Sequence, residues 1–119
     1  MASCVKQLLS GSTNGRLIKL AASSTPGTTI HTAGSVTGTD NVDEIWLWAV
    51  NTTTVSEKLT IEWGTTSAPD DNIELVLSPE GGLITIIPGL PLNNALVVRG
   101  FAAQANVVSI GGFVNQIRA

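Results

Sequence analysis

Apolar and polar residues alternate over short runs along most of this chain, and the alternation is clearest between residues 43 and 63. The first run, EIWLWAVN, places apolar side chains on both faces of a strand: Ile45, Leu47 and Ala49 on one, and Trp46, Trp48 and Val50 on the other. The second run has an apolar face of Leu59, Ile61 and Trp63 opposite a polar face of Lys58, Thr60 and Glu62. A strand covered on both faces beside a strand covered on one predicts a packed β-sandwich or an oligomeric β-protein.

The same pattern predicts an all-β chain without helices. No window of a dozen residues has apolar positions at helical spacing, and turn residues separate the runs. We expect strands at residues 4–9, 16–22, 28–32, 44–51, 57–63, 73–77, 83–88, 95–103 and 107–116. Short strands at this spacing predict an antiparallel β-sandwich, jelly-roll-like, with eight or nine short strands. The 119 residues form one domain, in which 1–41 is an N-terminal arm with a Thr/Gly-rich loop and 42–117 is the most strongly patterned core.

Two segments depart from the alternation. The segment from Thr25 to Asn41 is rich in Gly, Thr and Ser, and we expect an exposed loop or long hairpin with one weak strand. In residues 88–92, two prolines bracket Leu90, and proline cannot donate to a central ladder, so we expect a rigid crossover between strands. Arg99 stands among apolar neighbours, and we expect it to reach either a carboxylate, with Glu62 and Glu74 as candidates, or an exposed edge.

Composition and charge narrow the classes of function. Charged residues make up 13% of the chain and the net charge is −3. An uncharged polar surface of Thr, Ser, Asn and Gly favours lasting protein contacts, so we expect a homo-oligomer. The six Lys and Arg residues are scattered singly, which argues against a nucleic-acid partner. No apolar run reaches the roughly 20 residues of a membrane span, and the N-terminus lacks a signal-peptide pattern. We therefore expect no membrane association and synthesis in a cytoplasm.

Catalytic and metal-binding patterns are weak. The chain has a single histidine, His31, no Ser in a G-x-S-x-G context and a single cysteine, Cys4. Acidic residues gather at 40–44 and at 70–71, but neither group has the spacing of a calcium loop. We predict no enzyme activity, no catalytic residue, no metal site and no cofactor.

The tryptophans are the candidates for contact with a ligand or partner. Trp63 is in phase with Leu59 and Ile61, so we expect it in the core. Trp46 and Trp48 share a face with Val50, which is typical of core or of a subunit interface. An exposed Trp on a β-sandwich could instead stack on a sugar. We take Trp46, Trp48, Val97 and Phe101 as core or subunit-interface candidates, and expect a Trp46→Ser/Trp48→Ser variant to lose its fold or its oligomer.

From Val42 onward, the chain resembles a group of small β-proteins that tailed bacteriophages encode as virion structural proteins. The resemblance rests on the order of five blocks: DEIWLWAVNTT, LTIEWG, SPEGGL, IIPGLPLNNALVVRGFAA and NVVSIGGFVNQI. It implies a non-enzymatic part of the particle, first of all a capsid decoration (cement) protein that stabilises the head shell by binding the major capsid protein.

The resemblance also sets expectations for assembly and contacts. A decoration protein would lie on the capsid surface of the virion as a homo-oligomer, with a trimer favoured. Residues 25–39 or the N-terminal arm would touch the capsid, with contact candidates Thr28, Ile30, His31 and Thr37. Two alternatives remain open: a carbohydrate- or receptor-binding module of a tail fibre or tail tip, and a neck or head-completion protein.

Overall fold

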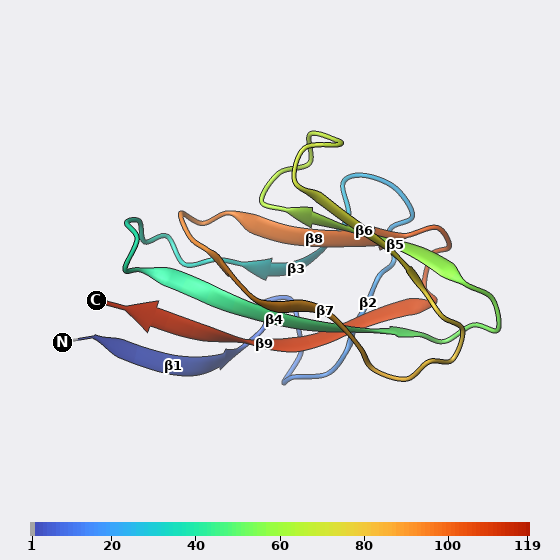
Figure 1. Cartoon of the computed structure of the whole chain (residues 1–119), viewed down its shortest axis with the longest axis horizontal. Helices are drawn as coiled ribbons and strands as arrows, with labels where there is room; N and C mark the ends of the chain where they lie inside the picture. The colour runs from blue at the N-terminus through green and yellow to red at the C-terminus, as the bar shows by residue number, and fades with distance from the viewer. Residues whose placement is uncertain (1) are drawn as a thin grey trace.

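The chain folds into two antiparallel β-sheets packed face to face, in a computed structural model that describes residues 2–119 (Figure 1). The nine strands are β1 (Ser3–Leu8), β2 (Ile18–Lys19), β3 (Thr28–Thr32), β4 (Val42–Asn51), β5 (Glu57–Trp63), β6 (Asn72–Leu77), β7 (Ile84–Leu92), β8 (Val97–Ala102) and β9 (Val108–Arg118). The predicted all-β sandwich is therefore confirmed.

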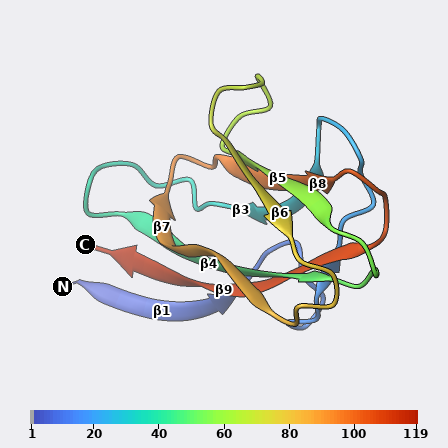
Figure 2. The same cartoon turned by 45° about the vertical axis from the view of Figure 1, so that its right-hand side comes forward.

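The strand order is that of a jelly roll. One sheet, here sheet A, has the order β1-β9-β4-β7, with β2 also paired to β9, and the other, sheet B, has the order β3-β8-β5-β6. Because β1 and β2 pair with successive parts of β9, they act as two halves of one interrupted strand. The eight strands then have the two-sheet order of a double Greek key, in which only β5 and β6 among the described residues are consecutive strands of one sheet. Figure 2 shows sheet A below and sheet B above, with both termini at the same end of sheet A.

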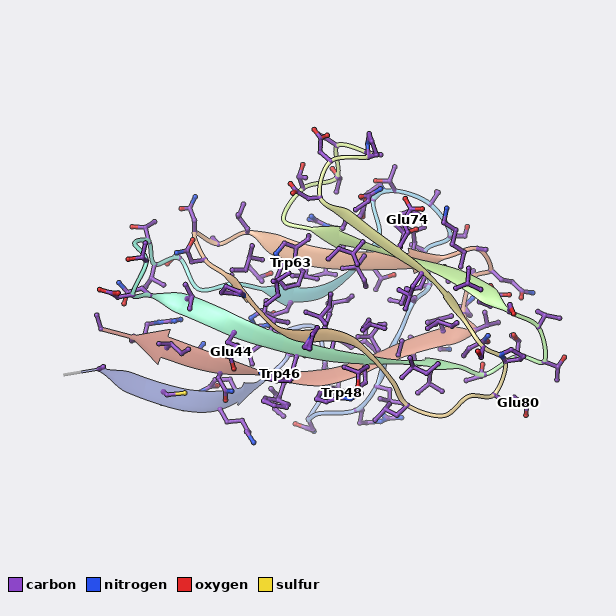
Figure 3. All side chains as sticks on the ribbon, in the orientation of Figure 1. Glu44, Trp46, Trp48, Trp63, Glu74 and Glu80 are labelled. Atoms are coloured by element: carbon purple, nitrogen blue, oxygen red, sulfur yellow. The ribbon has the colours of Figure 1, made fainter. Side chains whose placement is uncertain are left out.

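The core lies between the sheets and follows from the alternation in β4. Ile45, Leu47 and Ala49 are fully buried, whereas the residues between them are only partly buried. They pack against Leu59 and Ile61 of β5 and the other apolar core residues of sheet B. Trp63 is partly buried against this cluster and lies between the sheets in Figure 3, as its phase predicted.

The expectation of a crossover at residues 88–92 is wrong, because these residues continue β7. Pro88 and Pro91 pair with Trp46 and Glu44 of β4, with two register shifts along the pair. β7 is the outermost strand of sheet A, and an edge strand needs only one of its two sides for hydrogen bonding. The prolines and bulges also protect this edge from further pairing.

The outer face of β5 is less exposed to solvent than its sequence predicted. Thr60 and Glu62 are both buried, although they point away from the core. Glu62 accepts hydrogen bonds from the Thr25 hydroxyl and from the backbone N–H of Gly27, at 2.6 Å for the latter. The loop before β3 therefore covers this part of sheet B, and Figure 1 shows that loop rising on the outer side of the sheet.

Of the two outcomes expected for Arg99, the ion pair with Glu62 or Glu74 is not formed. Glu74 binds Lys58 across β5 and β6, with 2.7 Å between Oε1 and Nζ, and Glu62 is held by Thr25 and Gly27. Arg99 lies half-buried on the outer face of sheet B and has no carboxylate within ion-pair distance among residues 2–119.

Candidate functional site

The outer face of sheet A carries a group of apolar side chains, here called the aromatic patch and made up of Trp46, Trp48, Phe113, Leu8 and Leu17. The strands position these residues through their register. Trp46 and Trp48 occupy the outward positions of β4, Phe113 lies directly opposite Trp46 on β9, and Leu8 lies opposite Phe113 on β1. Residues directly opposite each other in an antiparallel pair share a face, so the three strands present one continuous apolar surface. Figure 3 shows Trp46 and Trp48 on the side of β4 that faces away from sheet B.

The three rings of the aromatic patch form one stacked group. Ring centroids lie 6.4 Å apart for Trp46 and Trp48, 6.0 Å for Trp46 and Phe113, and 5.9 Å for Trp48 and Phe113. The angles between the ring planes are 19°, 11° and 27°, so the rings are close to parallel. Each such pair contributes roughly 0.5–1.5 kcal/mol beyond its buried area, so the stacked arrangement is stabilised within the chain itself.

Two glycines let the rings and the loop approach the sheet closely. A Cβ at Gly89, in the bulged part of β7, would lie 2.8 Å from the Trp46 ring. A Cβ at Gly111 would lie 2.6 Å from a methyl group of Leu17, so Leu17 covers the bare backbone of β9 beside Trp48.

Polar groups lie on one side of the aromatic patch. Glu44 accepts hydrogen bonds from Trp46 Nε1 at 2.8 Å and from Asn115 Nδ2 at 3.0 Å. These two bonds, that of Asn115 first, hold the pKa of Glu44 below its usual value. The Lys6 ammonium lies 4.6 Å from the centroid of the Phe113 ring, a cation–π distance.

The aromatic patch is uncovered in the isolated chain. Leu8 and Leu17 are 56% and 53% exposed, and the three rings are partly exposed. The corresponding face of sheet B differs, because a loop covers the part around Glu62 and the Lys58–Glu74 ion pair lies on it. Contiguous exposed apolar residues with polar neighbours are typical of a protein interaction site. The two outer faces of the sandwich are therefore chemically unlike, and sheet A presents the adhesive one.

A second group of functional residue types lies at the end of the sandwich near the chain termini, where His31 and Asp43 are buried and Arg118 is partly exposed. His31 Nδ1 accepts a hydrogen bond from the Ser10 backbone N–H at 3.0 Å, so its proton is on Nε2, which donates to Asp43 Oδ2 at 2.9 Å. Arg118 Nη2 donates to Asp43 Oδ1 at 2.8 Å, and the Gly34 N–H donates to Oδ2 at 3.2 Å.

This buried group has a structural role. The Ser10 hydroxyl accepts from the Thr32 N–H and is not bonded to His31, and both nitrogens of the imidazole are already occupied. Burial disfavours ionisation of Asp43, but its hydrogen bonds to His31, Arg118 and Gly34 outweigh burial and lower its pKa. An ionised carboxylate therefore joins the segments around His31, Gly34 and Arg118 to β4.

The four predicted capsid-contact residues differ in their exposure to solvent. Thr37 is exposed and Thr28 is half-buried, but Ile30 and His31 are 0% and 3% exposed and are closed to a partner. The reason is a register shift between Thr29 and His31, which lets two consecutive residues of β3 point into the sandwich. A regular strand would have turned one of them outward.

The four core or interface candidates all lie outside the main core. Trp46 and Trp48 belong to the aromatic patch, whereas Val97 and Phe101 are half-buried on the outer face of sheet B. Sequence reasoning missed Phe113, Leu8 and Leu17 as members of this surface. Phe113 could have been found from its outward phase in β9, but Leu8 and Leu17 join the patch only through pairing between distant segments.

Other candidate chemistry is spread apart. Within residues 2–119, no three His, Cys, Asp or Glu side chains lie together as a metal ion would need, and no helix is long and apolar enough to cross a membrane. The acidic residues 43 and 44 point to opposite faces of β4, which divides the group at 40–44.

A cavity of about 450 Å³ beside the β4 and β7 ends contains no titratable side chain. It is lined by Gly38, Thr39, Val42, Pro91, Leu92 and Asn93.

Positive and negative side chains are distributed unevenly along the chain, which is a further signal that sequence reasoning missed. Residues 1–39 contain Lys6, Arg16 and Lys19 but no Asp or Glu, whereas residues 40–119 contain nine carboxylates and three cations. The signal is simple to read in the sequence once the charges are counted by segment. In the fold, it places the three cations on β1, β2 and their connection, along one edge of sheet A.

Comparisons with known proteins gave no match to a family model, to a curated protein or to a solved structure.

Proposed function

We propose that this chain is a non-enzymatic structural protein of a phage particle, a decoration (cement) protein that attaches to the major capsid protein through the aromatic patch. The observation that carries the proposal is the uncovered stacked group of Trp46, Trp48 and Phe113 on sheet A, next to the exposed Leu8 and Leu17. The resemblance of residues 42–119 to virion structural proteins supplies the biological setting.

The physical demands on a decoration protein support this function. Such a protein adds contacts across the joints of a shell, and it needs a rigid body and an adhesive face. The jelly roll provides the rigid body, because buried apolar residues from Leu9 near the N-terminus to Val114 in β9 pack into one core. The aromatic patch provides side chains of the type that dominate binding energy at protein interfaces, since Trp is enriched among such residues. A homo-oligomer, with a trimer favoured, is part of the proposal.

Replacing the tryptophans of the aromatic patch tests the proposal. The sequence predicted that a Trp46→Ser/Trp48→Ser variant would lose its fold or its oligomer, but neither ring lies in the main core, so we now expect the sandwich to be kept. The variant should instead lose affinity for heads that lack the chain by at least about 30-fold. Binding is measured by co-sedimentation with purified heads, and folding by circular dichroism and thermal unfolding.

Val76 offers a matched control on the other sheet. It is 67% exposed on β6, so Val76→Ser removes apolar surface without touching the aromatic patch. This variant should bind heads like the wild type. Equal binding by the tryptophan variant and the wild type, with both folded, would exclude the aromatic patch as the capsid-binding face.

A second candidate function is binding of a glycan by a tail-tip or tail-fibre module. The favouring observation is that Trp46 and Trp48 are partly exposed and lie beside Glu44 and Asn115, whose polar groups could bond to sugar hydroxyls. A sugar that stacks on these rings would quench their fluorescence. Saturable quenching by host-cell glycans, combined with no binding to heads, would favour this second function over decoration.

A further inference from the structure

The connection between β1 and β2 forms an open cavity of about 280 Å³, here called the basic cavity. It is lined by Gly11, Ser12, Thr13, Arg16, Leu17, Ile18 and Lys19. Two of the chain's six Lys and Arg residues, Arg16 and Lys19, belong to this lining, and both are exposed. Among residues 2–119 neither has a carboxylate within ion-pair distance, whereas Lys58 and Arg118 are both paired. The basic cavity therefore holds two cations that form no ion pair within the described residues.

The walls of the basic cavity are held in place by the backbone. The Gly11 N–H donates to the Ile30 carbonyl at 2.9 Å, and a Cβ at Gly11 would lie 2.5 Å from the same oxygen, so the connection is pressed against β3. The Arg16 N–H donates to the Thr13 carbonyl at 3.0 Å. Asn14 and Gly15 between them have φ values of 53° and 84°, which is the geometry of a tight type I′ turn. An ordered loop loses little conformational freedom when a ligand binds.

The basic cavity borders the aromatic patch. Leu17 lines the cavity and also packs on Gly111 of β9, and a Cβ at Gly15 would lie 3.2 Å from a methyl group of Leu8. Lys6 adds a third cation over the Phe113 ring. A partner seated on the aromatic patch would therefore meet positive charge along the edge formed by β1, its connection and β2.

We infer that the basic cavity binds a carboxylate of the protein partner that covers the aromatic patch, so that this partner presents an acidic side chain beside an apolar surface. The inference rests on the proposed function, and it specifies the chemistry of the partner. Arg presents paired donors that match a carboxylate, and Lys adds a point charge.

Charge complementarity favours an acidic protein over a nucleic acid. A nucleic-acid site needs several cations along a phosphate backbone, whereas the basic cavity has two. A single carboxylate contact at the rim of an apolar interface suits two cations, because it sets the register and partner choice of the complex.

A titration of the full chain with tetraglutamate peptide tests the inference. Amide shifts are followed by two-dimensional NMR at constant ionic strength, with tetraglutamine and inorganic phosphate as comparison probes. Saturable shifts should appear at residues 11–19 with tetraglutamate and be absent with tetraglutamine. The Arg16→Gln/Lys19→Gln variant should weaken this binding at least about tenfold, which corresponds to about 1.4 kcal/mol. Lys58→Gln, on the outer face of sheet B, should leave it unchanged.

Several outcomes would overturn the inference. Amide shifts at residues 11–19 that are no larger than those caused by chloride would show that the basic cavity is not a carboxylate-binding site. Shifts of equal size at Lys58 and Arg99 would show the same. Binding of phosphate without tetraglutamate would assign it to another oxyanion. Loss of a self-associated state in the Arg16→Gln/Lys19→Gln variant, without peptide binding by the wild type, would assign the cavity to a second copy of the chain. Because the titration uses the isolated chain, it can fail while the tryptophan variants still lose head binding, and the reverse also holds.

Discussion

Replacing Gly112 by Ala should destabilise the fold by at least about 4 kcal/mol, a large share of the roughly 5–15 kcal/mol by which native domains are stable. Gly112 lies in β9 opposite Leu47 of β4, in the middle of the longest strand pair of the sandwich. A Cβ at this position would lie 2.0 Å from the carbonyl oxygen of Trp46, far inside van der Waals contact. Backbone atoms cannot turn away as a side chain can, so β9 and β4 would have to separate locally. Urea unfolding followed by tryptophan fluorescence measures the loss.

Gly82→Ala is the matched control for this change. Gly82 also has a positive φ, 74°, but a Cβ there would have no heavy atom within 4 Å. Its substitution should cost only about 1–2 kcal/mol, from the backbone conformation alone. If Gly112→Ala and Gly82→Ala lowered the free energy of unfolding by the same amount, the close approach of β9 to β4 would be contradicted.

Replacing Asp43 by Ala should lower the free energy of unfolding by about 3 kcal/mol at pH 7. The carboxylate is fully buried and accepts from His31, Arg118 and the Gly34 N–H. Its loss would leave the His31 Nε2–H and the Gly34 N–H without an acceptor inside the protein, whereas Arg118 is partly exposed and can turn toward water. Asp70→Ala, in the exposed loop between β5 and β6, should change stability by less than about 0.5 kcal/mol.

Asp43 also predicts how stability depends on pH. Its pKa is lowered in the folded chain, so as pH falls the unfolded chain takes up this proton first. The stabilisation is therefore complete above the unfolded pKa of about 3.9 and is lost as pH falls through the folded pKa. The wild type should lose stability steeply below about pH 4, and Asp43→Asn should show a shallower loss. Urea unfolding at a series of pH values measures both. Equal acid dependence in the two proteins would contradict the ionised carboxylate.

Much of the fold could be predicted from apolar alternation. Each expected strand overlaps an observed one, because alternation in an antiparallel sheet directly records which side chains face the core. Proline rules failed at residues 88–92, since the sequence does not tell which strand lies at an edge. The bulge in β3 was missed for a related reason. Two consecutive inward residues, Ile30 and His31, break the alternation on which the prediction depends.

The candidate site was less predictable than the fold. A strand that is apolar on both faces, as β4 is, does not reveal which face is the core and which is exposed. The aromatic patch combines β4 and β9 with Leu8 and Leu17, which are far away in sequence. The prediction that Glu62 lies on a polar outer face failed for the same physical reason, because its burial depends on Thr25 and Gly27 in a distant loop. Contacts between distant segments are set by the topology, which local patterns do not encode.

The copy number of this chain in purified particles of the phage that encodes it tests the proposed function most directly. Quantitative mass spectrometry against the major capsid protein gives the ratio. A decoration protein predicts hundreds of copies in a simple ratio to the capsid protein. About six to a few dozen copies would place the chain in the neck or tail, and complete absence from the particle would contradict a structural role in the virion.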